Sequence, residues 1–405
     1  LRQALVESSL VAALASVAAV VVARSGLDAM RMLVPYQIPR LATVEVDGGV
    51  LAWTLLTGGV AALALGLLPA LGRGGSLGAI GRGRHSAGVG RRRFQGIVVG
   101  VQAALCVVVL VGATLLSRSY AELRAVDPGF GAPDTWAMTV PAPADVLEEI
   151  RRRVGELPGV ASAAVAYDHP LERNWGDSFV IEGAARAPDD PTPSASLRPF
   201  GTGYFETVGI DLVDGRLPTA ADEDRAVGLA VVNETLARDF FEGRSPVGAR
   251  IVVPTAQRAW GLDGLFEIAA VVRDVRFLGP DQPAGPALYV PLTHFPTSAT
   301  TLLVRPERPD AAIVGPVRAV VSEVDASLGL RDARRLEDLL DDLLARPRFN
   351  MLLLLAFGVI GLVLCGLGAY GLVARLVATR VREIGIRMAL GADRALVARG
   401  VLGQA

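Results

Sequence analysis

Residues 351–373 read MLLLLAFGVIGLVLCGLGAYGLV and are followed shortly afterwards by the stretch 379–392, TRVREIGIRMALGA. The first stretch is apolar throughout and is long enough for a helix to cross a bilayer, which takes about 20 residues. The second has the spacing of an amphipathic helix, because three apolar residues fall at i, i+3 and i+7, namely Val381, Ile384 and Met388. We therefore expect a membrane span followed by a short amphipathic helix, for which Gly391 is a typical stop.

The charges of the second stretch indicate its side of the membrane. Arg380 and Arg387 lie three residues before and four residues after Glu383, close enough to pair along one side of a helix. Arginines next to a span favour the cytoplasmic side. A simple stop-transfer anchor would carry arginines too, although an anchor does not require an apolar stripe with a defined end. Both interpretations stay open on these residues alone.

The composition of the whole chain indicates a membrane protein. The chain has 405 residues, of which 51% are hydrophobic, and its mean hydropathy is +0.43. These values are too apolar for an ordinary soluble enzyme and leave room for several spans and a domain. Both cysteines, Cys106 and Cys365, lie inside apolar runs, which excludes a disulfide framework and a cysteine-based zinc site.

Charge is divided unevenly along the chain. Residues 118–349 contain 35 acidic residues and 24 arginines, a net charge of −11, whereas the rest contains 6 acidic residues and 16 arginines, a net charge of +10. Residues 72–95 are rich in Gly, Ser and Arg, and no acidic residue occurs between Asp47 and Glu122. Such a run could bind nucleic acid, but Phe94 is its single aromatic residue and spans lie on both sides. A cytoplasmic linker explains it better, so we expect no nucleic-acid partner.

The apolar runs predict four spans, and the basic linker sets their direction. The predicted segments are two spans at about 8–23 and 50–71, a cytoplasmic linker at 72–95, a third span within 96–117, an extracytoplasmic domain at 118–349, a fourth span within 350–374, and a cytoplasmic segment at 379–405. Both ends would then lie in the cytoplasm, and the acidic domain would lie outside.

The extracytoplasmic domain has the pattern of a mixed α and β fold. Short apolar runs predict strands at 135–140, 160–166, 179–182, 229–232, 250–253, 266–272, 287–290 and 301–304. Longer charged runs predict helices at 144–157, 233–240, 310–324 and 336–344, the first with Val146, Ile150 and Val154 toward the core. The first and last portions would form one discontinuous α/β subdomain with a β-rich insert. The expected fold class is an α-helical membrane protein with four transmembrane helices and a large inserted α+β extracytoplasmic domain.

The residues that usually carry chemistry do not form a recognisable site. An Asp168-His169 pair would need a nucleophile, but no G-x-S-x-G elbow occurs, so a hydrogen-bonded surface histidine is the better interpretation. Asp222, Glu223 and Asp224 lack the spacing and glycine of a calcium loop, which favours a solvated loop. The chain contains no lysine and hence no Walker A loop for nucleotide phosphates. We expect no enzyme, cofactor or metal, and any ATP-driven work must come from a partner.

The basic stretch and five others resemble one known family. Residues 382–392, REIGIRMALGA, resemble the coupling helix of the MacB/FtsX family of ABC transporter permeases. The stretches that resemble the extracytoplasmic domain of that family are GYFETVGI at 203–210, GR at 215–216, VVNE at 231–234, PVG at 246–248 and VVRDV at 271–275. The resemblance implies an inner-membrane permease with a MacB-like periplasmic core domain, a separate ABC ATPase subunit and dimer-like pairing of permease units.

The same resemblance implies a mechanism. Closure of the ATPase dimer on ATP would push on the coupling helix, and the fourth span would transmit the shift to the outer domain, for export or for mechanotransmission. The residues that would contact the ATPase are Arg382, Glu383, Ile384, Gly385, Arg387, Met388, Leu390 and Gly391. The alternative is a membrane-tethered extracytoplasmic binding or sensor protein without transport, which needs no ATPase.

The order of the segments resembles duplicated orphan permeases described from acidobacteria, in which two permease units share one chain. Residues 8–71 would be the last two spans of one unit, and residues 96–374 the first two spans of the next with the loop domain between them. Arg2-Gln3-Ala4-Leu5-Val6-Glu7 and Arg399-Gly400-Val401-Leu402-Gly403-Gln404 share the pattern R-x-x-L-x-E/Q. With Leu1 in place of an initiator methionine, we expect the chain to be a fragment of such a protein.

Overall fold

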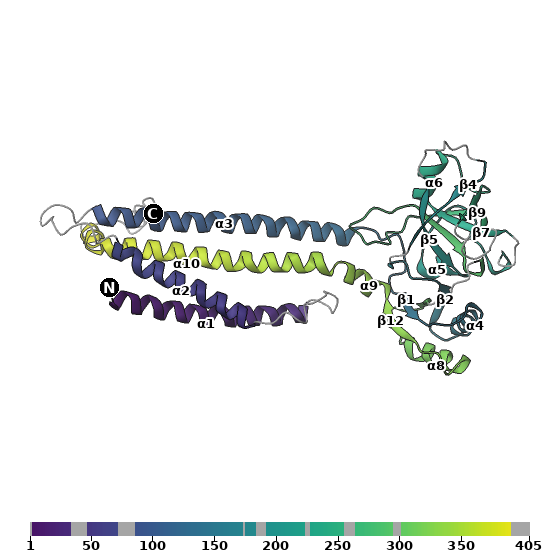
Figure 1. The fold of residues 1–405 in the computed structure, drawn as a ribbon, viewed down its shortest axis with the longest axis horizontal. Helices are drawn as coiled ribbons and strands as arrows, with labels where there is room; N and C mark the ends of the chain where they lie inside the picture. The colour runs from purple at the N-terminus through teal and green to yellow at the C-terminus, as the bar shows by residue number, and fades with distance from the viewer. Residues whose placement is uncertain are drawn as a thin grey trace. The chain divides into compact units, whose positions relative to one another are not determined.

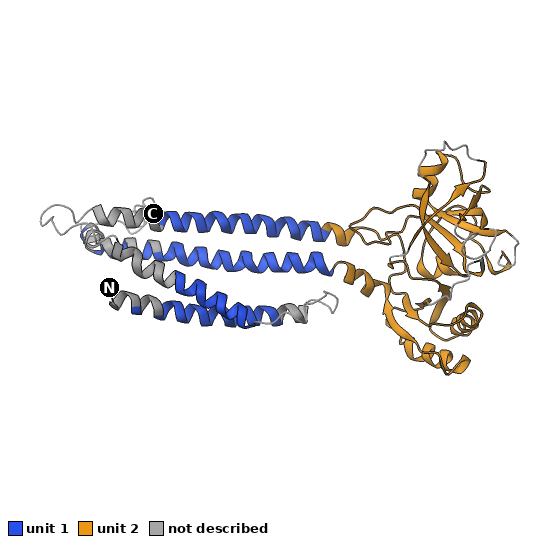
Figure 2. Ribbon diagram, viewed as in Figure 1, with its two compact units in different colours: residues 1–121, 345–405 blue, residues 122–344 orange. Residues whose placement is uncertain are grey.

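The computed structural model describes residues 2–33, 47–71, 86–172, 175–183, 192–222, 227–254, 264–294 and 301–389. The chain divides into two compact units, one made of residues 1–121 and 345–405 and the other of residues 122–344 (Figure 2). The first unit is helical and the second contains every strand of the described chain (Figure 1).

Four long helices form the first unit: α1 (Arg2–Leu33), α2 (Gly48–Leu71), α3 (Ser86–Ala125) and α10 (Ala345–Ala389). Three of them contain stretches apolar and long enough to cross a membrane, at Leu10–Asp28, Gly96–Ala125 and Ala345–Gly371. The expected second span lies in α2, where side chains are described only over Gly48–Val60, a shorter apolar helix. Three candidate spans are therefore present in the described residues, and the expected number of four stays a prediction.

The helices are longer than the apolar runs predicted. α3 begins at Ser86, inside the segment expected to be a linker, and α1 continues to Leu33, beyond the predicted end of its span. The linker prediction relied on the frequency of Gly, Ser and Arg. Arginine is a good helix former, however, and isolated glycines lower helix stability by only about 1 kcal/mol each, so this composition does not stop a helix.

The second unit is built on one mixed sheet. The strand order is β12-β1-β11-β2-β5-β10-β7-β9-β8-β4, with β3 added beside β5 and β6 beside β9. The strands are β1 (Trp136–Thr139), β2 (Val160–Ala166), β3 (Gly176–Ser178), β4 (Val180–Ile181), β5 (Ser194–Phe200), β6 (Leu212–Gly215), β7 (Gly228–Asn233), β8 (Arg250–Val252), β9 (Leu265–Val272), β10 (Ala287–Pro291), β11 (Thr301–Pro306) and β12 (Arg331–Arg335). Most pairs are antiparallel, but β5 with β10 and β7 with β9 run parallel.

One end of the sheet combines the first and last portions of the domain. Strands β12, β1, β11 and β2 are neighbours there, and α4 (Ala144–Gly155) and α8 (Val314–Val324) pack on them over a shared apolar core. In α4 the fully buried residues are Leu147, Ile150 and Val154, so the predicted core-facing pattern omitted Leu147. Val146 is only partly buried at the edge of this core.

The middle of the chain forms the other end of the sheet, around a core of its own that includes the helix α6 (Glu234–Phe241). The two ends of the sheet join at β2 and β5, where the pairing is Ala166 with Phe200. A third core lies around the short helix α5 (Tyr204–Val208) and also takes in Leu336 of α9 (Leu336–Leu343). β5, β12 and α5 were not among the predicted elements.

Candidate functional site

The predicted coupling stretch is the last part of α10. The helix runs without interruption from Ala345 to Ala389, so the expected separate short helix after the span is instead a continuation of the span helix. The reason is local, because no proline occurs between Met351 and Ala389 and the glycines there are isolated within the helical pattern. The apolar and basic parts therefore belong to one helix of 45 residues, about 67 Å long at 1.5 Å per residue.

The structure places most of the predicted ATPase-contact residues on this helix without describing their side chains. The backbone at Arg382, Glu383, Ile384, Gly385, Arg387 and Met388 is helical, whereas Leu390 and Gly391 lie outside the described residues. Three large apolar side chains are described on this portion of α10, Val377, Val381 and Ile386, with exposed fractions of 38%, 61% and 55%. Val377 and Val381 lie one turn apart, whereas Ile386 lies on another face of the helix. Their exposure matches that of the apolar residues in the preceding span, such as 61% at Leu367.

Helices α3 and α10 pack against each other along a glycine-lined seam. A Cβ atom added at Gly112 of α3 would lie 3.0 Å from a methyl of Leu354, and one added at Gly358 of α10 would lie 3.1 Å from a methyl of Leu110. Farther along, Gly361 faces Cys106, which is buried. Residue numbers rise along α3 as they fall along α10, so the two helices are antiparallel, as a span that leaves the cytoplasm and one that returns require.

The seam has the spacing of a coiled coil. The α10 residues at the seam, Leu354, Gly358, Gly361 and Gly368, recur at intervals of three, four and seven. That is a heptad pattern, and small residues at such positions let transmembrane helices approach closely. The seam therefore keeps the backbones of α3 and α10 close together over several turns.

The Asp168-His169 pair does not form a catalytic arrangement. Asp168 forms a buried ion pair with Arg198, with 2.5 Å between Oδ2 and Nη1, and the Arg198 guanidinium lies 3.9 Å from the centre of the Phe277 ring. His169 Nδ1 accepts a hydrogen bond from the Leu171 N–H. The expectation of a hydrogen-bonded histidine is confirmed, but its surface position was wrong, because only 19% of the side chain is exposed.

The protonation of His169 follows from this environment. Burial disfavours the charged imidazolium, and the nearby Arg198 and Arg334 add repulsion, which together lower its pKa to about 4. The imidazole is therefore neutral at neutral pH. A hydroxyl belongs to the group, Ser196 Oγ, but it accepts a hydrogen bond from Arg198 Nε at 3.2 Å and is thus bonded to the arginine. The geometry indicates a structural polar cluster.

Asp222 also has a structural role. Its carboxylate accepts two hydrogen bonds of 2.8 Å from Arg216 and further ones from the Thr219 N–H and hydroxyl. These donors, Arg216 first, hold the pKa of Asp222 far below its usual range. Asp222 ends a single 3₁₀ turn (Ala220–Asp222) in the connection between β6 and β7, and its carboxylate closes that turn. Glu223 and Asp224 lie outside the described residues. Within the described ranges, no three His, Cys, Asp or Glu side chains gather in a way that would hold a metal ion.

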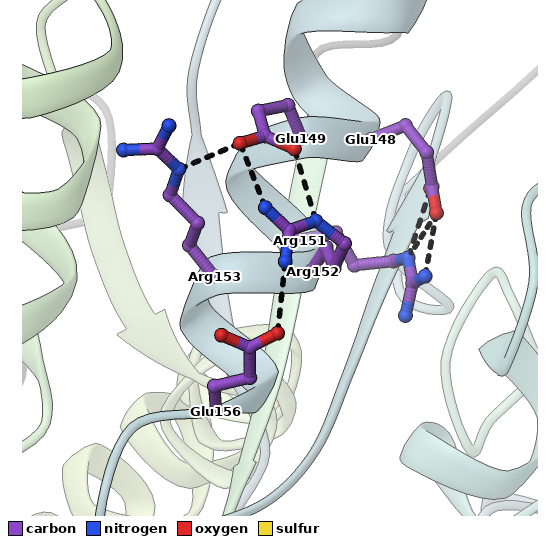
Figure 3. Close-up of polar contacts among 6 residues, drawn as sticks. All are labelled: Glu148, Glu149, Arg151, Arg152, Arg153 and Glu156. Atoms are coloured by element: carbon purple, nitrogen blue, oxygen red, sulfur yellow. Dashed lines mark hydrogen bonds and ion pairs between the residues drawn. The ribbon is translucent and has the colours of Figure 1, made fainter.

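The outer face of α4 carries paired charges (Figure 3). Arg152 bridges Glu149 and Glu156 at 2.9 Å each, and Arg153 reaches Glu149 at 2.7 Å. The two arginines lower the pKa of Glu149 to about 2. Exposed pairs of this kind contribute little to stability. Each arginine in them is matched by a carboxylate, so this face is not arranged as a site for an anionic ligand.

Two of the stretches that carry the family resemblance meet in space. Asp274 follows β9, and its carboxylate accepts hydrogen bonds from the Asn233 amide at 2.6 Å and from the Thr235 hydroxyl at 2.7 Å. Asn233 Oδ1 in turn accepts from the Leu236 N–H and the Ala287 N–H. Asn233 thus caps α6 and ties it to β9 and β10, a role that only the pairing of distant strands reveals.

Comparison with known proteins identifies a family and a curated relative. The family of MacB-like periplasmic core domains matches residues 95–320. A curated relative, the macrolide export ATP-binding/permease protein MacB of Aggregatibacter actinomycetemcomitans, is 26% identical over 217 residues, which is 49% of this chain and 31% of the relative. The chain therefore spans less than a third of that relative.

Two solved structures are similar as well. One is the periplasmic region of MacB from Actinobacillus actinomycetemcomitans, with 14% identity, a TM-score of 0.36, and coverage of 52% of this chain and 92% of that one. The other is the extracellular domain of the noncanonic ABC-type transporter YknZ from Gram-positive bacteria, with 14% identity, a TM-score of 0.33, and coverage of 49% and 100%.

Proposed function

Because the chain belongs to the family of MacB-like periplasmic core domains, and with it to the MacB/FtsX-type permeases of ABC transporters, we propose that it couples ATP hydrolysis by a separate ATPase to movement of its outer domain. Membership makes it a membrane protein with an extracytoplasmic domain, which agrees with its three candidate spans. The domain is the second unit, residues 122–344.

The unbroken α10 is the observation that carries this proposal. One end of the helix begins directly after α9, the last element of the outer domain, and the other end contains the residues of the coupling signature. Pro347 lies in the first turn of α10, where a proline is tolerated, and no proline occurs from Met351 to Ala389. A push on residues 382–389 is then delivered to the domain through backbone hydrogen bonds of a single helix, which makes α10 the transmission element.

The coupling stretch is the proposed contact with the ATPase. Arg382, Glu383 and Arg387 supply polar contacts at a groove of the ATPase, while Ile384, Met388 and Leu390 fill it. The spacing of Val381, Ile384 and Met388 at i, i+3 and i+7 supports this assignment, because it gives a helix an apolar stripe. An amphipathic helix that inserts its apolar face into a groove is a common mode of recognition.

Co-purification tests the proposal. The full chain, with Arg387→Glu and Met388→Asp combined, should no longer retain an ABC ATPase from membranes or stimulate its ATP hydrolysis. The control is Arg346→Glu, which reverses the charge of an arginine near the opposite end of α10 as Arg387→Glu does and should leave both intact. Equal ATPase retention by the double variant and the wild type would refute the proposal and favour a tethered binding or sensor protein.

A further inference from the structure

Two segments connect the outer domain to the long helices, and they are bonded to each other. The first, residues 126–135, follows α3, and the second, residues 331–344, contains β12 and α9 and precedes α10. The Leu336 N–H donates to the Thr135 carbonyl at 2.9 Å, and the Glu337 N–H donates to the Pro133 carbonyl at 2.8 Å. Next to them β1 and β12 pair antiparallel. The segment after α3 and the segment before α10 are therefore joined by backbone hydrogen bonds.

The segment after α3 is hydrogen-bonded to α5. The last carbonyls of a helix have no partner within it and must be satisfied from elsewhere. In α5 and its cap, three consecutive carbonyls accept from the segment after α3: Thr207 O from Thr135 Oγ1 at 3.0 Å, Val208 O from the Ala132 N–H at 3.1 Å, and Gly209 O from the Gly131 N–H at 2.7 Å. The apolar contacts coincide with the polar ones, because Phe130, Leu336 and the α5 side chains Tyr204, Phe205 and Val208 share one buried core.

Gly209 makes this approach possible. Its φ is +77°, a conformation that disfavours side chains, and a Cβ atom there would lie 2.9 Å from the Ala132 nitrogen and 3.0 Å from the Gly131 nitrogen. Any side chain would therefore push the backbone of residues 131–132 away from the carbonyls that it binds. The glycine is required by two independent constraints at one position.

The residues just before α5 hold the two ends of the sheet together. Phe200 pairs with Ala166, the Gly201 N–H donates to the Val165 carbonyl at 2.9 Å, and Arg198 forms the buried ion pair with Asp168. We call residues 198–210 the junction segment. It binds the α/β end of the sheet on one side and the chain from α3 on the other, while it belongs by sequence to the β-rich middle.

We propose that the junction segment is the element through which movement of α3 and α10 reaches the β-rich middle of the domain, with Gly209 as its positioning residue. The source of that movement rests on the proposed function, but the mechanical connection does not. It requires only that residues 131–135, 336–337 and 203–210 open and close as one cooperative unit.

Hydrogen exchange on the full chain in nanodiscs tests the connection, with Gly209→Ala compared with Gly243→Ala. Gly243 has nearly the same φ, +78°, but no atom lies within 4 Å of an added Cβ, so it reproduces the backbone cost without the collision. Gly209→Ala should accelerate exchange about tenfold at residues 131–132. It should accelerate exchange equally at residues 336–337, because their N–H groups donate to the carbonyls of Thr135 and Pro133 in the same segment. Gly243→Ala should change neither. Acceleration confined to residues 203–210 would overturn the proposal.

A milder variant covers the case in which Gly209→Ala does not fold. Thr135→Val keeps the side-chain volume and removes the hydroxyl that binds the Thr207 carbonyl, and it should accelerate exchange at residues 336–337 and 203–210 together. Unchanged exchange at either place would contradict the proposal.

The functional consequence has a separate readout. With spin labels at Val180 on β4 and Leu115 on α3, both exposed, addition of ATP to the ATPase-bound wild type should change the label distance. Gly209→Ala should retain the ATPase and lose the distance change. Retention of the change would overturn the role of the segment in transmission. If no ATPase binds even the wild type, the proposed function fails, and the exchange result alone decides whether the connection exists.

Discussion

Acidification from pH 6.5 to pH 4 should destabilise the outer domain through His169. In the folded state its pKa is about 4, lowered by burial and by Arg198 and Arg334, whereas the unfolded chain has the ordinary value of 6.5. Above pH 6.5 both states are neutral at this residue and it adds no pH dependence. Between the two pKa values the unfolded state binds a proton that the folded state does not, so the free energy of unfolding falls as the pH falls.

The magnitude follows from the gap between the two values. With 1.36 kcal/mol for each unit by which two pKa values differ, the loss is about 3 kcal/mol at pH 4 and constant below it. His169→Asn keeps an acceptor for the Leu171 N–H but cannot titrate. Urea unfolding of the full chain in nanodiscs, followed by near-ultraviolet circular dichroism from pH 7 to pH 4, should give the variant a pH dependence weaker by about this amount. Identical curves for both proteins would refute the assigned environment.

Three other variants test the packing of the two units. Arg198→Met leaves the buried Asp168 carboxylate without its ion pair and should lower the free energy of unfolding in the same assay by about 3–5 kcal/mol, most of which Asp168→Leu should restore in the double variant. Gly358→Leu should lower the melting temperature of the full chain in nanodiscs, because it fills the seam against a leucine of α3, whereas Gly366→Leu, with open space around it, should not. Asn233→Ala should cost about 1–3 kcal/mol in urea unfolding, since two buried N–H groups lose their acceptor; a loss below 0.5 kcal/mol would contradict this.

Regular apolar patterns predicted much of the fold. β2 was expected at residues 160–166 and is found at Val160–Ala166, and α6 begins directly after Asn233, whose side chain caps it. The helix was expected at 233–240, so its position was predicted to within one residue, but the role of Asn233 as its cap was not. The continuity of α10 was missed because Arg380 and its neighbours change the polarity of the helix without changing its backbone preference.

The elements that join the domain together could not be predicted in this way. β5 contains Arg198 and Pro199, two residues that are typical of a loop. Arg198 is buried in the domain only because it pairs with Asp168, which lies 30 positions earlier in the chain. The contact of Thr135 with α5 bridges 72 positions. The candidate coupling residues stay a prediction from the sequence, and the structure adds that residues 382–389 continue the span helix α10.

The glycines between α3 and α10 have a mechanical consequence. Gly112 and Gly358 each face a leucine of the other helix, since an added Cβ atom would lie 3.0 Å from Leu354 and 3.1 Å from Leu110. A leucine seated against a glycine cannot shift along the helix without meeting the larger side chains beside that glycine, so these contacts set the register of α3 against α10. The segment after α3 and the segment before α10 are also hydrogen-bonded to each other at Thr135 and Leu336. A shift of one helix along the other is therefore opposed both by packing at the seam and by backbone hydrogen bonds between the segments that continue the two helices.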